Sequence, residues 1–208
     1  MAGHRRAPVG RITAVLVWAS IVLVLGTAIA YLLLIRAQGE DRDPASSGIV
    51  PFVAGYMFVM AVLLWLSILD RPALASKRPV FRAAAAAGLL VLGVIAAFSI
   101  GLPIFVAGVL ATIAAGLALA GPHPGQQVLS EVAAAIVAVA VLVAGFEVAE
   151  RMITCPASGT MGGSGVGFVT GGYTWQCVNG ELHMQSGFCS SGGQSVDANG
   201  NVTATSGC

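Results

Sequence analysis

The sequence predicts an all-α polytopic membrane bundle followed by a small, Gly-rich, disulfide-stapled, β-leaning domain. Four apolar runs precede Arg151, at residues 12–35, 49–69, 80–121 and 128–149. A helix of about 20 apolar residues crosses the hydrocarbon core of a bilayer, which is roughly 30 Å thick. All four cysteines lie beyond Arg151, in a polar tail. The chain therefore divides into a membrane-spanning part and an attached domain of a different kind.

Composition supports lipid as the main solvent of the chain. Hydrophobic residues make up 57% of it and charged residues 9%, with a mean hydropathy of +0.88. Soluble domains contain about 25% charged residues, so this chain cannot cover a water-facing surface with polar groups. A net charge of +1 gives no reason to expect nucleic acid as a partner. Nine arginines against one lysine, with abundant Ala, Val and Gly, indicate GC-rich codons and a bacterial source.

The apolar runs are long enough for five spans. We expect helices at 12–35, 49–69, 80–100, 103–121 and 127–149. The run 80–121 is divided into two helices, because one helix of that length would be about 60 Å long. Gly101-Leu102-Pro103 is a turn signal in the middle of that run. A signal peptide cleaved after Ala30 is the alternative for the first run. Its length exceeds the 7–15 apolar residues of a signal sequence, which favours an uncleaved anchor.

The charged residues orient these spans. With residues 1–11 in the cytoplasm, inner segments hold seven basic residues and outer segments hold three, namely Arg36, Arg42 and Arg151. The positive-inside rule therefore predicts the N-in/C-out orientation in a plasma (inner) membrane. Residues 12–150 would form the bundle and residues 151–208 an extracytoplasmic tail. Cysteines confined to that tail agree with this orientation, because disulfides persist in oxidising compartments.

Small residues recur in the later helices and predict close helix packing. Gly108, Thr112, Gly116 and Ala120 follow one another at four-residue spacing. Helices associate in lipid through close contact, which small residues permit. We expect the third, fourth and fifth helices to form a tight unit. Two interpretations of the seam stay open: packing within the chain, and contact with a second copy or a partner protein.

Two glutamates in the fifth apolar run are candidates for a proton or ion site. Ionisable residues inside a membrane are functional candidates, and Glu131 and Glu147 lie only about 24 Å apart along a helix. The structural alternative places Glu131 in a first helical turn, where the helix dipole favours an anion. In that alternative Glu147 pairs with Arg151, four residues on. Intramembrane Ser and Thr hydroxyls are expected to bond their own helix backbone.

The tail predicts a β-hairpin held by disulfides. Residues 173–177 and 182–184 favour strands and flank an Asn179-Gly180 turn, and Asn199-Gly200 suggests a second turn. Residues 159–172 are Gly-rich and predict a flexible linker. So short a tail cannot build a large core, so we expect structural disulfides. The four cysteines allow three pairings, among which the sequence does not choose: Cys155, Cys177, Cys189 and Cys208.

These features favour a non-enzymatic membrane accessory protein without catalytic, cofactor or metal residues. It would present its exported domain to a membrane-protein partner, or assemble as a homo-oligomer in the lipid bilayer. A small transporter or channel that uses Glu131 or Glu147 is the alternative. A membrane enzyme is a third hypothesis, for which the cluster Glu147, Glu150 and Arg151 is the nearest candidate.

Overall fold

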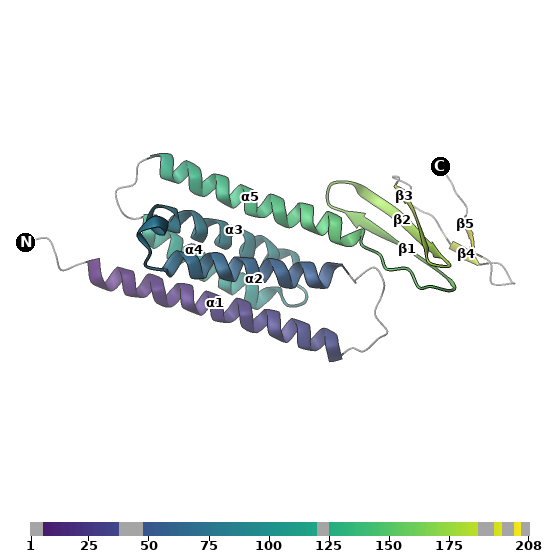
Figure 1. The fold of residues 1–208 in the computed structure, drawn as a ribbon, viewed down its shortest axis with the longest axis horizontal. Coiled ribbons are helices and arrows are strands. Elements are labelled where there is room, and N and C mark those ends of the chain that lie inside the picture. The colour runs from purple at the N-terminus through teal and green to yellow at the C-terminus, as the bar shows by residue number, and fades with distance from the viewer. Residues whose placement is uncertain (1–5, 38–47, 120–124, 187–193, 197–201, 205–208) are drawn as a thin grey trace, which may run out of the picture. The chain divides into compact units, whose positions relative to one another are not determined.

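A computed structural model describes residues 6–37, 48–119, 125–186, 194–196 and 202–204. The chain forms two compact units. The helical unit contains four helices and the fifth as far as Gly145, and the sheet unit contains the rest of the fifth helix, from Phe146, and all the strands. Figure 1 shows the helices of the helical unit running side by side.

The described residues contain five α-helices, close to the predicted positions. Their bounds are Arg6–Ala37 (α1), Ile49–Ile68 (α2), Arg78–Ile95 (α3), Gly101–Leu119 (α4) and Gly125–Glu150 (α5), and the 3₁₀ helix η2 (Pro72–Lys77) precedes α3. Four helical segments are long and apolar enough to cross a membrane: Gly10–Ala37, Ile49–Ile68, Pro72–Ile95 and Val128–Glu150. Gly101–Leu117 is a shorter apolar helix. The chain is therefore a mostly helical protein with four to five candidate membrane spans.

The break in the third apolar run lies earlier than predicted. Turns at residues 96–100 separate α3 from α4, and Gly101, Leu102 and Pro103 form the first turn of α4. Proline is tolerated there, because the first amides of a helix need no partner within it. The amide of Gly101 donates to the carbonyl of Ala96, and a Cβ at Gly101 would overlap the carbonyls of Gly93 and Ala96. Glycine is thus required where the hairpin closes.

The helices present apolar side chains outward as well as inward. No more than a third of the most apolar window in each candidate span is buried. Val15, Val22 and Leu33 on α1 are each more than 60% exposed, as are Ile136 on α5 and Phe98 in the α3–α4 turn. Such a surface is unfavourable in water, but it matches the hydrocarbon of a bilayer.

Small residues bring α3 and α4 close together, as the sequence predicts. A Cβ on Gly93 would lie 2.6 Å from the amide nitrogen of Phe105, and one on Gly108 would lie 2.9 Å from that of Leu90. The buried stripe of α4 is built of Ile104, Ala107, Ala111 and Ala114, and α1 also packs on this helix. Backbones approach closely where both faces carry little side chain.

The fifth helix does not belong to this tight unit, which corrects the expectation for the third to fifth helices. Helix α5 instead meets aromatic residues of α2. The Tyr56 hydroxyl donates to the carbonyl of Ala138 at 2.9 Å, and the ring of Phe52 occupies the notch at Gly145. The rings of Phe52 and Tyr56 keep the backbones of α2 and α5 apart. The small residues of α5 would allow a close approach only to a helix whose facing side chains are also small.

The sheet unit confirms the predicted hairpin. Strands β2 (Gly171–Val178) and β3 (Glu181–Ser186) pair antiparallel, and Val178 lies opposite Glu181. The two turn residues, Asn179 and Gly180, have φ values of 49° and 90°. Positive φ at both positions is what a two-residue type I′ turn requires. Strands β4 (Gln194–Val196) and β5 (Val202–Ala204) form a second pair, and the predicted Asn199-Gly200 turn lies outside the described residues.

The Gly-rich stretch is not a linker, so that prediction is wrong. Strand β1 (Thr160–Gly167) pairs antiparallel with β2 along its whole length. Gly163 lies opposite Trp175, and Gly165 lies opposite Tyr173. A Cβ on Gly163 would lie 2.9 Å from the indole of Trp175. The glycines therefore leave room for aromatic rings of the next strand to lie across β1, which stabilises the strand by cross-strand packing.

Candidate functional site: an arginine-lined cavity at one end of the helical unit

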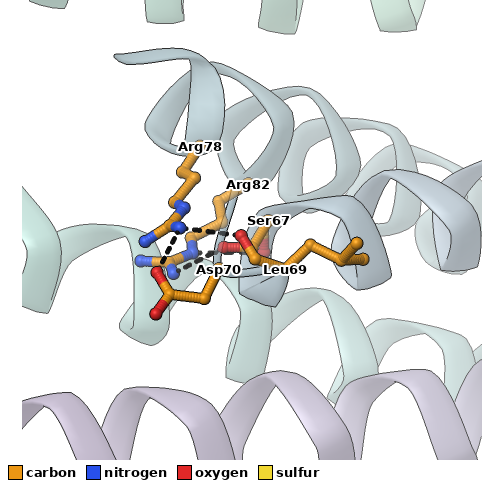
Figure 2. Close-up of polar contacts among 5 residues, drawn as sticks. All are labelled: Ser67, Leu69, Asp70, Arg78 and Arg82. Carbon is orange, nitrogen blue, oxygen red and sulfur yellow. Dashed lines mark hydrogen bonds and ion pairs between the residues drawn. The ribbon is translucent and has the colours of Figure 1, made fainter. Parts of the chain in front are cut away.

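Two arginines from α3 bind the carboxyl-terminal end of α2. Arg82 Nη2 donates to the carbonyl of Ser67 at 3.1 Å, and its Nε reaches the Ser67 hydroxyl at 3.3 Å. Arg78 Nη2 donates to the carbonyl of Leu69 at 2.7 Å. The last carbonyls of a helix have no partner within it, and a cation there is favoured by the helix dipole. Figure 2 shows both side chains extending from α3 toward this end.

Arg78 carries more hydrogen-bonding capacity than its partners use. It also pairs with Asp70 at 2.8 Å, but Asp70 is fully exposed, so water screens this ion pair. The Nε of Arg78 is buried and has no hydrogen-bond acceptor in the part of the chain that the structure describes. A buried donor left without an acceptor costs about 1–3 kcal/mol. The site is thus short of acceptors.

The two arginines line a cavity of about 480 Å³. Its walls are the end of α2, Arg78 and Arg82 of α3, and two further helices, which contribute Gly10, Thr13, Ala14 and Leu117. The site therefore combines two guanidinium groups with mostly small or apolar walls. Its chemistry suits the binding of an anion, because guanidinium groups form paired hydrogen bonds with carboxylate and phosphate oxygens.

Sequence reasoning used Arg78 and Arg82 only as charges and did not identify this cavity. Their four-residue spacing was a usable signal, because it places both on one face at the start of a helix. The short connection after α2 was a second signal, since it keeps that face near the end of α2. The contribution of α1 and α4 to the walls depends on tertiary packing and has no local signal.

Glu131 lies on the inward face of α5. Its side chain is buried, with 6% of its residue surface exposed, and it shares a face with Ala138 and Leu142, which are also buried. Its Oε1 has no hydrogen-bond partner among the described residues. The first-turn interpretation is wrong, because α5 begins at Gly125 and Glu131 lies in its second turn. The helix dipole is weaker there.

Glu147 has partners that the sequence did not reveal. Its carboxylate accepts hydrogen bonds from the amide of Val169 and from the hydroxyl of Thr170, which lies 2.8 Å away in the β1–β2 turn. The predicted pair with Arg151 is present, at a longer separation of 3.9 Å. Glu147 therefore holds the β1–β2 turn against the last turn of α5, which is a structural role.

Glu150, the other glutamate of the cluster considered for a membrane enzyme, lies against Tyr173. The carbonyl of Glu150 accepts a hydrogen bond from the Tyr173 hydroxyl at 3.0 Å, and its Oε2 is buried without a partner in the described chain. Burial, and then the negative charge of Glu150, raise the pKa of Tyr173. Among the described residues, no group of three His, Cys, Asp or Glu side chains is placed to hold a metal ion.

The structure contains the disulfide Cys155–Cys177, which closes a 22-residue separation. Cys177 is fully buried, beside Tyr173 and Trp175, in a small core that Ile153, Cys155 and Met161 complete. This bond joins the segment after α5 to the central strand of the three-stranded sheet. Cys189 and Cys208 lie outside the described residues.

The predicted small-residue seam is only partly used within the chain. Gly108 packs against Leu90 of α3, whereas Thr112 and Gly116 are exposed and Ala120 lies outside the described residues. The Thr112 hydroxyl donates to the carbonyl of Gly108 in its own helix, as predicted for such hydroxyls. Ser20, Thr27 and Ser67 do the same, and the Ser99 hydroxyl donates to the carbonyl of Ala96 within the α3–α4 turn.

No protein-family model, curated protein or solved structure matches this chain. Its function is therefore inferred from its own residues.

Proposed function

We propose that the chain is a non-enzymatic accessory protein of the plasma (inner) membrane that presents a disulfide-bonded sheet to a partner on the extracytoplasmic side. In this proposal five helices cross the membrane in the N-in/C-out orientation. The apolar outward faces and the basic residues clustered at the predicted inner side support it. A disulfide in the sheet unit is consistent with an oxidising compartment.

The observation that carries the proposal is the firm junction between α5 and the sheet. The Thr170 hydroxyl binds Glu147, the Tyr173 hydroxyl binds the carbonyl of Glu150, and Cys155 is bonded to Cys177. Within the sheet unit, two hydrogen bonds thus fix the strands to the last turn of a candidate span, and the disulfide fixes them to the segment that follows it. A domain that must offer a defined surface to a partner requires such a fixed base.

An exposed apolar turn suggests how the sheet meets the membrane. Val166 and Val169 are each more than 75% exposed, and Phe168 is 59% exposed. The ring of Phe168 lies 6.2 Å from that of Phe146, which belongs to the candidate span Val128–Glu150. A turn beside the end of a span lies at the level of the bilayer interface. We propose that these side chains rest among the lipid headgroups, where aromatic residues are favourable.

The partner is tested by purifying the full-length protein from its native membrane in a mild detergent and measuring co-purifying proteins by quantitative mass spectrometry. A stoichiometric protein that is lost from the Cys155→Ser/Cys177→Ser variant, but kept by the exposed-strand variant Ser164→Ala, supports presentation by the sheet. A solitary protein that moves a solute in proteoliposomes overturns the proposal. Cysteine labelling from either side of the membrane checks the orientation independently.

A small transporter or channel is the second candidate, and it is favoured by the buried Oε1 of Glu131, which has no partner in the described part of the chain. The two glutamates supply a matched pair of variants, because Glu147 is already engaged by the β1–β2 turn. We expect Glu131→Gln to abolish proton or cation flux in proteoliposomes, and Glu147→Gln to leave it intact. Flux unchanged in both variants, or absent from the native protein, removes this candidate.

A further inference from the structure

The cavity at the end of the helical unit carries an excess of positive charge. Of its lining residues Arg78 and Arg82 are cationic and Asp70 is anionic, and Asp70 is fully exposed to solvent. The wall residues from α1 and α4 are uncharged. A cavity with this balance attracts anions, and the fixed geometry of the guanidinium group favours planar oxygen groups such as phosphate.

Both arginines are held in place before any ligand arrives. Arg82 is bound to Ser67 through two nitrogens, and Arg78 is bound to the carbonyl of Leu69. The Nε of Arg78 is nevertheless left without an acceptor among the residues that the structure describes. A prearranged group with an unused donor gains a hydrogen bond on ligand binding at little cost in conformational entropy.

The surroundings favour a lipid over a soluble anion. The cavity of about 480 Å³ is larger than a phosphate ion needs, and Ala14, Ile68 and Leu117 contribute to its walls. Ile12 and Val15, on the neighbouring outer surface of α1, are each more than 50% exposed and face the predicted hydrocarbon. A headgroup bound here can therefore extend its acyl chains along an apolar helix surface.

We propose that this cavity binds the phosphate of an anionic phospholipid, with Arg78 and Arg82 as the groups that contact it. The inference rests on the proposed function in one respect, the N-in orientation, which places the cavity at the cytoplasmic leaflet. Anionic lipids attract basic residues there, and basic pockets between membrane helices bind lipid headgroups. Arg11, Arg71 and Lys77, near the same end in sequence, add to the attraction.

The test uses the full-length protein in detergent, with thermal unfolding measured as phosphatidylglycerol, phosphatidylcholine or inorganic phosphate is added. Phosphatidylglycerol is expected to raise the Tm saturably, and the other two are not. The variant Arg78→Gln is expected to weaken the apparent affinity about tenfold, as the loss of a charge-assisted hydrogen bond does. Arg36→Gln removes the same charge at the far end of α1 and serves as the control.

Three results overturn the proposal. Equal stabilisation by both lipids denies recognition of the anionic headgroup, and equal weakening by Arg78→Gln and Arg36→Gln reduces the effect to general charge. Stabilisation by inorganic phosphate alone assigns the cavity to a soluble anion.

Circular dichroism of each variant verifies its helix content, and Arg82→Lys provides a second variant that keeps the charge at α2 but loses the paired geometry. Because no partner or orientation enters this assay, its failure is distinct from failure of the proposed function.

Discussion

The hydroxyl of Thr170 donates a hydrogen bond to the carboxylate of Glu147 across 2.8 Å and 23 residues of sequence. The amide of Val169 donates to the same carboxylate. A residue that the sequence offered as an intramembrane ion site is thus the anchor of a β-turn. The contact ties a candidate membrane span to the domain that follows it, and it makes a specific prediction.

Replacing Glu147 by Ala should loosen the β1–β2 turn without altering the helices. The substitution removes the acceptor of two hydrogen bonds, so the amides of residues 166–170 should exchange hydrogen faster, because their local opening becomes easier. Hydrogen exchange with mass spectrometry of the full-length protein measures this. Arg151→Ala removes only the longer ion pair and should have a much smaller effect. Equal effects of the two variants would contradict the assignment.

Glycine in β1 should not tolerate a methyl group where an aromatic ring lies across it. In Gly163→Ala and Gly165→Ala the new Cβ would overlap Trp175 or Tyr173, and the sheet should lose about 1–3 kcal/mol, as overpacking typically costs. Faster hydrogen exchange along β2 reports the loss. Ser164→Ala, at the exposed position between them, is the control and should be near neutral. Wild-type exchange in Gly165→Ala would show that the glycines are not required.

The hairpin turn and the glycine strand show what a sequence can predict. Asn179-Gly180 was predictable, because positive φ at two adjacent residues is a local requirement that this dipeptide meets. Gly163 and Gly165 were misread as a linker, because their purpose depends on Trp175 and Tyr173, which lie on another strand. The same limit explains the missed cavity, where Arg82 acts on Ser67 fifteen residues earlier in the chain.

The positions of the apolar helices were predictable, because the length of an apolar run and a Gly-Pro turn signal can both be read locally from the sequence. The break near Gly101 was placed several residues late, because glycine and proline are allowed both in a turn and in the first turn of a helix. The partner of α5 was wrong for another reason. The count of small residues on α5 said nothing about the rings of Phe52 and Tyr56 that face it.

All four cysteines should be oxidised in the native protein. With Cys155 bonded to Cys177, Cys189 and Cys208 are the only other pair that four cysteines allow. Alkylation of the unfolded protein should therefore add four groups after reduction and none before it, as intact mass shows. Removing Cys155 and Cys177 together should cost the sheet unit about 3 kcal/mol for a loop of this length. Two alkylated thiols before reduction would refute the second bond.

Tyr173 should make the sheet sensitive to high pH. Because its pKa is raised in the folded state, the neutral phenol is favoured there. Its contribution is full below about pH 10, the unfolded value, and is lost as pH rises through the raised pKa. Tyr173→Phe lacks the hydrogen bond to Glu150 and should cost about 1 kcal/mol at pH 7. Unfolding in urea is followed by Trp175, with Trp18 and Trp65 replaced by Phe. The urea midpoints of the proteins with Tyr173 and with Phe at this position should converge above pH 10. A constant gap would contradict the linkage.

Gly93 and Gly116 separate packing within the chain from packing between chains. A Cβ on Gly93 would lie 2.6 Å from the backbone of Phe105, whereas one on Gly116 meets nothing within 4 Å. Gly93→Ala should therefore lower the Tm of the purified protein. Gly116→Ala should leave the Tm equal or higher, because alanine is more favourable than glycine inside a helix by about 1 kcal/mol. Gly116→Ile is the decisive variant. If α4 contacts a second copy through Thr112 and Gly116, the bulky residue will dissociate that oligomer in light scattering from detergent solution. If the seam faces lipid, the mass will not change.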